Sequence, residues 1–225
     1  VPVLPDALVY VNLFGNLADY DRLRQYCDKY RIPLIEDAAQ SLGSYYGKTP
    51  SGKLGDISSL SFAPSKPLPC FGNGGMVLTD SEDERDIVRS MRYHAVGTGK
   101  LEHGYNSCLS NDHANVLNFL FSKYKKLLSK TKKVRKWYED KLLDLGISSI
   151  QTSLGTTSNN HKLVIRTQDR DGLRKFLESK GVQTQVHYAQ PMSKMKMFET
   201  GQHMPNAERF CMDVLSLPIH PFIKN

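Results

Sequence analysis

Residues Pro33–Gly47 read PLIEDAAQSLGSYYG, and residues Gly52–Lys66 read GKLGDISSLSFAPSK. Each stretch contains a short apolar run, Pro33–Glu36 in the first and Ile57–Phe62 in the second, with the length and composition of a buried strand. An acidic residue ends the first run, and a lysine follows the second at position 66. Because ligands of open α/β sheets bind beyond the carboxyl ends of strands, these two stretches predict a sheet with chemistry at that edge.

The neighbouring segments alternate between strand and helix patterns. Ala7–Phe14 and Gly75–Thr79 are apolar runs typical of strands, whereas Asp19–Tyr30 spaces its apolar residues three or four apart, as a helix does. Ser81–Tyr93 is a second predicted helix, whose first serine is the N-cap and whose Glu84 completes a capping box. This order predicts an α/β fold with a largely parallel sheet.

The second half of the chain has a different pattern. Ser110–Leu145 predicts a long helix with one apolar stripe, and its basic residues between Lys123 and Lys141 occupy the other face. These basic residues could form a nucleic-acid or phosphate patch, but a solvated helix face is the favoured interpretation. The elements expected after it are a strand at His161–Arg166, a helix at Asp171–Lys180, a strand at Val182–His187 and helical pieces to Ser216. They predict a small α+β domain.

The composition narrows the class of protein. Hydrophobic residues make up 40% of 225 residues, which suffices for a packed core. The net charge is +7, yet no motif supports a nucleic-acid partner. No apolar run approaches the roughly 20 residues of a membrane span. The four cysteines are far apart and form no CxxC pair, so we expect free thiols, no metal site and a cytoplasmic protein. The chain begins with Val1 almost directly before a strand, which suggests a fragment of a longer reading frame.

Three features of the first half could carry chemistry. Asp37 ends a strand, where it could face a ligand or cap the next helix with equal odds. Lys66 lies between two prolines that stiffen its loop, and Ser61 lies on the strand before it. Phe71–Gly75, FGNGG, is better explained as a hairpin turn with glycines at positive φ than as a phosphate cradle. Each signal is weak alone.

Together, in this order and spacing, the motifs resemble the DegT/DnrJ/EryC1/StrS family of sugar aminotransferases, which use pyridoxal 5'-phosphate (PLP) and have the aspartate-aminotransferase fold (fold type I). The matching segments are VNLFGNLADYDRL, PLIEDAAQSLGSYYG, GKLGDISSLSFAPSK, FGNGGMVLTD, MRYH, GYNSCLSNDHA, VHY and LSLPIHP. The resemblance implies that residues 1–112 are the C-terminal part of the PLP-binding large domain. Residues 113–225 would then be the long helix plus a small α+β domain.

The resemblance assigns roles to five residues. Lys66 matches the lysine that holds PLP as a Schiff base, which requires an amine that can lose its proton. Asp37 matches the acid that keeps the pyridinium nitrogen protonated. Gln40 matches a residue near the ring and its phenolic oxygen, and Ser61 matches a hydroxyl that binds the phosphate. Asn106 matches an asparagine that reaches the phosphate of a neighbouring subunit, which implies a homodimer with a shared active site.

The implied reaction moves an amino group from glutamate to PLP and then to a keto group of a nucleotide-linked deoxysugar. Lys66 would shuttle the proton between substrate carbon and cofactor carbon. His187 and Tyr188 match a His-Tyr pair near the sugar site, although a lone histidine is more often structural. These roles imply an enzyme of amino-sugar and surface-polysaccharide synthesis, with no metal and no membrane partner.

The sequence departs from the family pattern in two places. Family members carry a long N-terminal portion that supplies a Gly-Thr phosphate loop, an aromatic that stacks on the ring and several strands, and none of it is present here. We therefore expect an unprotected sheet edge and no transamination by this chain alone. Cys108 stands where the family usually has arginine, and Asn111 and His113 replace the usual Glu and Gln.

Three alternatives remain open. PLP-dependent sugar dehydratases of the same family replace the lysine with histidine, and Lys66 argues against that class. A non-catalytic remnant that serves as a binding or assembly subunit fits Cys108 and the absent N-terminal portion, but not the retained Asp37, Gln40, Ser61 and Lys66. The last alternative is a split enzyme whose remaining part is a separate chain.

Overall fold

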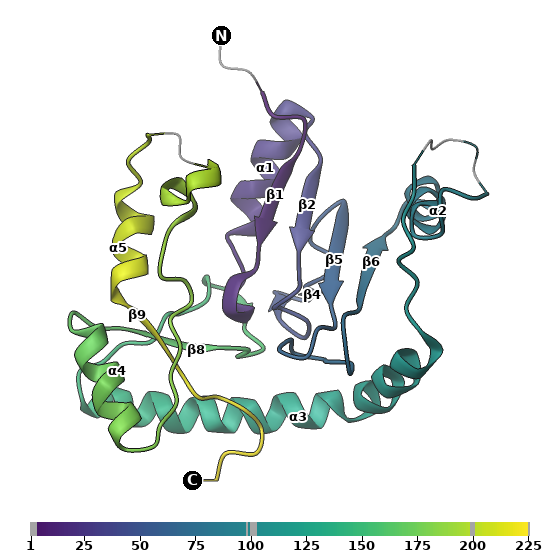
Figure 1. The fold of residues 1–225 in the computed structure, drawn as a ribbon. Helices are drawn as coiled ribbons and strands as arrows, with labels where there is room; N and C mark the ends of the chain where they lie inside the picture. The colour runs from purple at the N-terminus through teal and green to yellow at the C-terminus, as the bar shows by residue number, and fades with distance from the viewer. Residues whose placement is uncertain (1–3, 98, 100–102, 199–200, 225) are drawn as a thin grey trace. The chain divides into compact units, whose positions relative to one another are not determined.

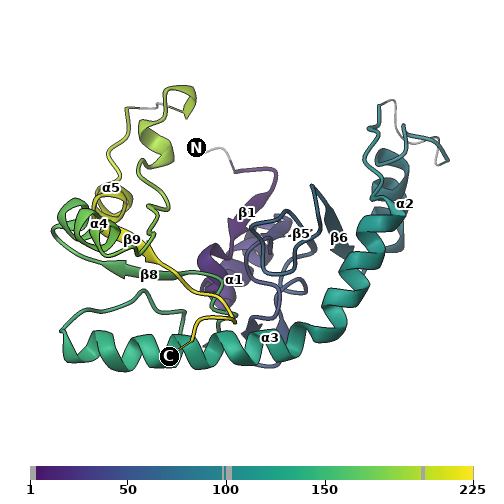
Figure 2. The ribbon, with the colours of Figure 1, turned by 60° about the horizontal axis from the view of Figure 1, so that its bottom comes forward.

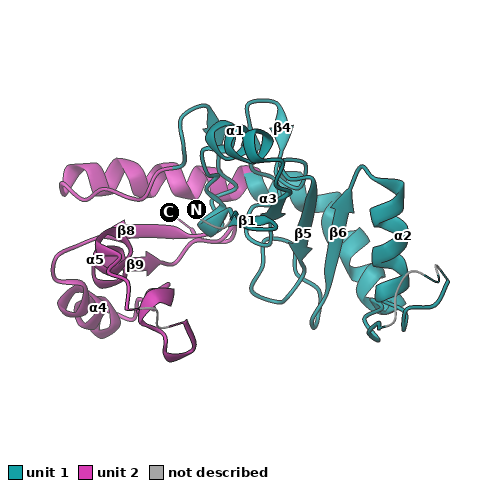
Figure 3. Ribbon diagram, turned by 90° about the horizontal axis from the view of Figure 1, so that it is seen from above, with its two compact units in different colours: residues 1–128, 152–161 teal, residues 129–151, 162–225 magenta. Residues whose placement is uncertain are grey.

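The computed structural model describes residues 4–97, 99, 103–198 and 201–224. The chain forms two compact units (Figure 3). Unit 1 comprises residues 1–128 and 152–161, and unit 2 comprises residues 129–151 and 162–225. The predicted domain limit between residues 112 and 113 stays a prediction.

Unit 1 is built on a four-stranded sheet (Figure 1). Its strands are β1 (Leu8–Val11), β2 (Leu34–Asp37), β5 (Ile57–Ser61) and β6 (Gly75–Thr79), and they lie in that order. The first three strands are parallel, and β6 runs antiparallel to β5. The prediction of a largely parallel sheet is confirmed, and β1 and β6 are its two edges.

The predicted helix starts are confirmed for α1 (Tyr20–Tyr30) and only half confirmed for α2 (Glu82–Met91). Ser81 Oγ accepts a hydrogen bond from Glu84 N at 3.3 Å, as an N-cap does. The reciprocal bond of the capping box was predicted wrongly, because Ser81 N donates to Thr79 Oγ1 at 3.0 Å instead. Thr79 Oγ1 also donates to the Glu84 carboxylate, so the preceding strand takes over the role expected of Ser81 N.

The two faces of the sheet are covered differently. Leu34 and Leu60 point to the face on which α1 and the helix that follows residue 110 pack, and both are buried there. Figure 1 shows α1 behind β1 and β2. Residues of opposite parity are on the other face, where Val9 is 63% exposed and Val77 is 43% exposed. Parallel sheets are normally covered on both faces, so this second face is apolar surface that unit 1 itself leaves open.

Because this open face ends in two edge strands, we expect the isolated chain to self-associate. Replacing both Val9 and Val11 with lysine is expected to reduce the associated fraction at equal concentration, since lysine on an edge strand opposes strand pairing. Analytical ultracentrifugation measures the fraction. Leu154→Lys, at a fully exposed residue outside the sheet, is the control and should change little. Equal effects of the two changes would contradict the prediction.

A second, smaller sheet ties a distant segment to unit 1. Its strands are β4 (Thr49–Pro50), β3 (Tyr45–Tyr46) and β7 (Thr156–Thr157), in that order. β7 lies in residues Thr152–His161, which we call the strap. Leu17 N donates to Thr152 Oγ1 at 3.0 Å, and Ser153 Oγ donates to Leu17 O at 2.9 Å. The strap therefore belongs to unit 1 although it follows the long helix in the chain.

The long helix α3 (Asn111–Asp144) is continuous in Figures 1 and 2. Its first part buries Leu117 and Tyr124 in unit 1, and its second part buries Val134 and Leu142 in unit 2. The lysines from position 123 to position 141 are all exposed, so the interpretation as a solvated face is confirmed for them. Within the same run Arg135 is buried instead. Its guanidinium donates to Glu139 Oε1 and Ser149 Oγ, each at 2.7 Å.

The described residues of unit 2 form a two-stranded antiparallel sheet and two further α-helices. Its elements are β8 (Leu163–Arg166), α4 (Arg170–Ser179), the 3-10 turns Met192–Lys194 and Lys196–Phe198, α5 (Pro205–Asp213) and β9 (Val214–Leu217). The strand predicted at residues 182–187 is wrong, because only Gln185 pairs with the sheet, at Ser216. The helix predicted to Ser216 ends at Asp213, since periodicity cannot separate a four-residue apolar strand from a helix.

None of the helices in the described parts of the chain is both long enough and apolar enough to span a membrane.

Candidate active site

The predicted acid and hydroxyl end two neighbouring parallel strands, and the predicted lysine lies in the loop after the second strand. Asp37 is the last residue of β2, and Ser61 is the last residue of β5. The strand register pairs Asp37 with Ser59, and Ser61 lies two residues further on the same face. The loop that carries Lys66 begins directly after Ser61. The structure therefore brings Asp37, Ser61 and the Lys66 loop to one edge of one sheet, where α/β proteins bind ligands.

The Lys66 loop is held by its own backbone. Lys66 N donates to Ala63 O at 2.9 Å, and Cys70 N donates to Phe62 O at 2.7 Å. Ser61 Oγ accepts from Ala63 N at 3.4 Å, and the Lys66 side chain is half-buried. Together with the two flanking prolines, these bonds fix the point from which the lysine side chain leaves the loop.

Glycine is required in residues 71–75 for a different structural reason from the predicted one. β5 and β6 form the expected antiparallel pair, with Lys66 in their connection. The expectation of positive φ is wrong, because no glycine of this run has it. A Cβ on Gly74 would lie 2.9 Å from Leu109 Cδ1, and one on Gly75 would lie 2.9 Å from Leu60 O. Close packing, and not left-handed backbone, accounts for these two glycines.

Asp37 is half-buried, and its Oδ1 accepts from Ala39 N at 3.0 Å. The neighbouring Glu36 points to the opposite face and is fully buried. Its carboxylate accepts five hydrogen bonds, from Asn12 Nδ2 at 2.8 Å, Ser51 Oγ at 2.6 Å, Gly52 N at 2.9 Å, Leu54 N at 3.0 Å and Ser58 Oγ at 3.0 Å. This role of Glu36 was not predicted from the sequence. The alternation of side chains along a strand could have indicated it, because two adjacent acids on a strand point to opposite faces of the sheet.

Gln40 is buried beside the turn that follows β1. Its Oε1 accepts from Phe14 N at 2.9 Å, which leaves Nε2 as the donor end of the amide. Phe14 has a φ of 65°, in the left-handed region that is costly for a bulky residue. This backbone conformation directs the Phe14 N–H to Gln40, so the orientation of the amide is set by β1 and its turn.

Gly15, next to Phe14, is expected to tolerate no side chain. Its φ is 87°, and a Cβ would lie 1.8 Å from Asn159 Oδ1. Gly15→Ala should therefore lower the free energy of unfolding by about 2 kcal/mol or more. Gly47→Ala is the matched control, because Gly47 also has positive φ but no atom within 4 Å of its Cβ position. Denaturant titration of both variants measures the difference, and equal losses would contradict the clash.

Asn106 is exposed and pairs through its backbone with Tyr93. Cys108 is exposed too, and its Sγ donates to Arg92 O at 3.7 Å. Neither residue joins the group formed by Asp37, Ser61 and the Lys66 loop through a described hydrogen bond. The role of Asn106 toward a second subunit stays a prediction.

His187 and Tyr188 are in unit 2. His187 Nδ1 lies 2.9 Å from Ser216 Oγ on β9, and Tyr188 is exposed. Burial, and secondarily the charge of Lys162, lowers the pKa of His187. This bonding gives His187 a structural role within unit 2, and a role for the pair at the sugar site stays a prediction.

Because the folded pKa of His187 is lowered, the unfolded chain binds its proton more readily. The contribution to stability is present above the ordinary imidazole value of about 6.5 and is lost as the pH falls below it. We expect the thermal midpoint to fall more between pH 7.5 and 5.5 in the wild-type chain than in His187→Gln. Calorimetry at both pH values measures this difference, and an identical fall in the two proteins would contradict it.

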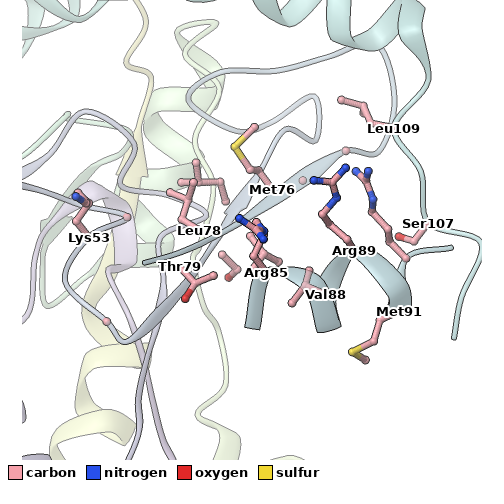
Figure 4. Close-up of a pocket in the computed structure, with 18 of the residues that line it drawn as sticks. Lys53, Met76, Leu78, Thr79, Arg85, Val88, Arg89, Met91, Ser107 and Leu109 are labelled. Atoms are coloured by element: carbon pink, nitrogen blue, oxygen red, sulfur yellow. The ribbon is translucent and has the colours of Figure 1, made fainter. Parts of the chain in front are cut away.

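A hollow of about 1250 Å³ in unit 1 lies along β6 and α2 (Figure 4). Met76 and Leu78 line it from β6, and Arg85 and Arg89 line it from α2. None of the predicted site residues lines this hollow, which follows the unpaired edge of the sheet. Its lining does include Ser59 and Gly75, the strand partners of Asp37 and Ser61. Among the described residues, no group of three or more His, Cys, Asp or Glu side chains is placed to hold a metal ion.

Comparison with known proteins identifies the family of the chain. The family model for the DegT/DnrJ/EryC1/StrS aminotransferase family matches residues 5–225. The chain belongs to this family. A DegT/DnrJ/EryC1/StrS aminotransferase from Brucella abortus, 28% identical, superposes with a TM-score of 0.92 over 98% of the chain and 61% of its own. DesV of S. venezuelae, solved with a ketimine intermediate, is 31% identical and superposes with a TM-score of 0.91 over 99% of the chain and 62% of its own.

Two curated relatives have a similar degree of sequence identity. The UDP-2-acetamido-2-deoxy-3-oxo-D-glucuronate aminotransferase of Pseudomonas aeruginosa is 31% identical over 96% of the chain. The dTDP-3-amino-3,4,6-trideoxy-alpha-D-glucose transaminase of Streptomyces venezuelae is 33% identical over 97% of the chain. The chain spans 61% of the first relative and 59% of the second. The resemblance inferred from the motifs, and the partial α/β aminotransferase fold that it implied, are confirmed.

Proposed function

We propose that this chain is the cofactor-binding part of a PLP-dependent aminotransferase that acts on a nucleotide-linked keto-deoxysugar with glutamate as amino donor. The observation that carries the proposal is the meeting of Asp37, Ser61 and the Lys66 loop at the carboxyl end of adjacent parallel strands. Membership of an aminotransferase family supports it, as do the nucleotide-sugar substrates in the names of the two curated relatives.

The residues at this edge fit the polar groups of PLP. Asp37 uses Oδ1 for Ala39 N, so its carboxylate is oriented and Oδ2 can accept from the pyridinium nitrogen. Ser61 offers a hydroxyl for the phosphate, and Gln40 offers Nε2 as a donor for the phenolic oxygen. Lys66 supplies the amine from a fixed loop. Bound PLP would supply the electron sink that stabilises a carbanion.

The protein's own contribution is to orient groups and to move a proton. The carboxylate of Asp37 would hold a proton on the ring nitrogen, and Lys66 would transfer a proton at the substrate carbon. Asn106 is exposed, as contact with the phosphate of a second subunit in a homodimer requires. His187 and Tyr188 would contact the sugar. The four free cysteines are consistent with the reducing cytoplasm.

A non-catalytic binding or assembly subunit is the second candidate. Cys108 favours it, because a thiol cannot replace the charge of the arginine usual at this position. The open face of the sheet also favours it, since the chain alone leaves apolar surface uncovered. Covalent binding of PLP at Lys66 is the step that separates the two candidates.

The test is a titration of the chain with PLP, followed by borohydride reduction and peptide mapping. Labelling at Lys66 supports the proposal. Absence of label, or label spread over exposed lysines such as Lys53, would leave the non-catalytic candidate ahead. Glutamate added to the PLP-loaded chain alone is expected to give no aminated cofactor, and its formation would refute the prediction that the chain does not transaminate by itself.

A further inference from the structure

The strap reaches the turn that carries Gln40 through a single buried residue, Asn159. Asn159 Nδ2 donates to Gln40 O and to Leu42 O, each at 2.9 Å. Its Oδ1 accepts from His161 N at 2.9 Å. The side chain is 5% exposed and uses both ends of its amide. One residue that lies 119 positions after Gln40 therefore fixes the backbone on which Gln40 is carried.

Asn159 also fixes the backbone that binds the Gln40 amide. Ser44 Oγ accepts from Asn159 N at 2.9 Å and donates to Gly15 O at 2.7 Å. Gly15 packs so closely against Asn159 Oδ1 that no Cβ fits between them. Phe14 is bonded directly to Gly15, and its N–H is the donor to Gln40 Oε1. The Asn159 side chain thus holds the backbone that carries the amide, and it packs against the segment that carries the hydrogen-bond donor, which the Asn159 backbone N–H also holds through Ser44.

We infer that Asn159 is a positioning residue for the PLP site and acts through Gln40; the inference rests on the proposed function. An amide held at its backbone and at Oε1 presents Nε2 in one place, so less freedom is lost when it donates to the cofactor. Removing the Asn159 side chain releases Gln40 O, Leu42 O and the packing against Gly15 together, whereas the bond from Asn159 N to Ser44 Oγ remains. Gln40 then keeps its chemistry but loses its fixed orientation.

A purely structural role predicts a different result, and Ser153→Ala provides the comparison. Ser153 is in the same strap and donates to Leu17 O, but no described hydrogen bond joins it to Gln40 or its turn. The proteins to compare are the wild-type chain, Asn159→Ala, Ser153→Ala, Gln40→Ala and the double variant Asn159→Ala/Gln40→Ala. Two quantities are measured: the Kd for PLP from absorbance titration, and the hydrogen exchange rate of the Phe14 amide.

Asn159→Ala is expected to raise the Kd for PLP about tenfold and to speed exchange of the Phe14 amide, whereas Ser153→Ala does neither. In the Gln40→Ala background, Asn159→Ala should add no further change in Kd, because the residue through which it acts is absent. The exchange rate reads the Phe14–Gln40 hydrogen bond without any cofactor, and a merely structural strap residue would not change it selectively.

The outcomes separate this inference from the proposed function. If the wild-type chain binds no PLP, the proposed function fails, and the inference fails with it. If the wild-type chain binds PLP but Asn159→Ala matches Ser153→Ala in both quantities, the inference alone is overturned. If Asn159→Ala does not fold, the milder Asn159→Ser is measured in its place, and failure of both to fold assigns Asn159 a structural role and overturns the inference.

Discussion

Replacing Lys66 with alanine is expected to abolish the visible absorbance band of lysine-bound PLP completely. The reason is covalent, because an alanine side chain has no amine to attack the aldehyde, whereas the other groups of the site remain in place. The measurement is an absorbance spectrum of the PLP-loaded chain after removal of free cofactor. Non-covalent PLP bound through Asp37, Gln40 and Ser61 should persist at lower affinity.

Two further variants make the Lys66 result specific. Lys66→Arg keeps the positive charge but not the reactive amine, so it should lose the band as the alanine variant does. Lys53→Ala removes an exposed lysine that lies 3.8 Å from Asp80, and it should leave the band unchanged. A band that survives in Lys66→Ala would assign the covalent site to another lysine and would remove the main support for the proposed function.

Replacing Glu36 with alanine is expected to be the most destabilising single change in unit 1. The substitution leaves five donors without their acceptor, in a place from which water is excluded. Buried donors without a partner cost about 1–3 kcal/mol each, and partial relaxation brings the expected loss to about 3 kcal/mol. For a chain of this size that loss lowers the thermal midpoint by roughly 10 °C.

Glu36→Gln and Glu82→Ala complete this experiment. Glutamine keeps the volume but turns one acceptor into a donor that faces donors, so it should also be clearly destabilising. Glu82 is on the exposed face of α2, and its removal should change the midpoint little. Differential scanning calorimetry measures all three variants. Equal midpoints for the Glu36 and Glu82 variants would show that the buried carboxylate contributes nothing.

The sequence predicted that Asp37, Ser61 and the Lys66 loop lie at one edge of the sheet, but it did not predict the residues that hold them there. Asp37 could be found because a strand run ends directly before it, and Lys66 because it lies in the loop after the next run and because the motif spacing is specific. The function of Glu36 could not be read in the same way, because its five donors come from five positions between Asn12 and Ser58 that only the fold brings together. Local patterns carry no information about such long-range partners.

The errors in the predicted elements have the same cause. Residues 182–187 alternate like a strand, but whether a run pairs depends on the available neighbour, and only Gln185 finds one at Ser216. The capping box at Ser81 was overridden by Thr79, which belongs to the preceding strand and accepts the bond instead. In both cases the outcome depends on a group that the local sequence does not specify.

The return of the strap to unit 1 has a consequence for synthesis on the ribosome. The chain leaves unit 1 after residue 128, builds part of unit 2, and comes back at residue 152 before it departs again at residue 162. Folding during translation therefore cannot finish the first-made unit when its first 128 residues emerge, because β3 and the Gln40 turn still await bonds from β7 and Asn159. A chain stalled before residue 161 would expose that unfinished edge to chaperones and proteases.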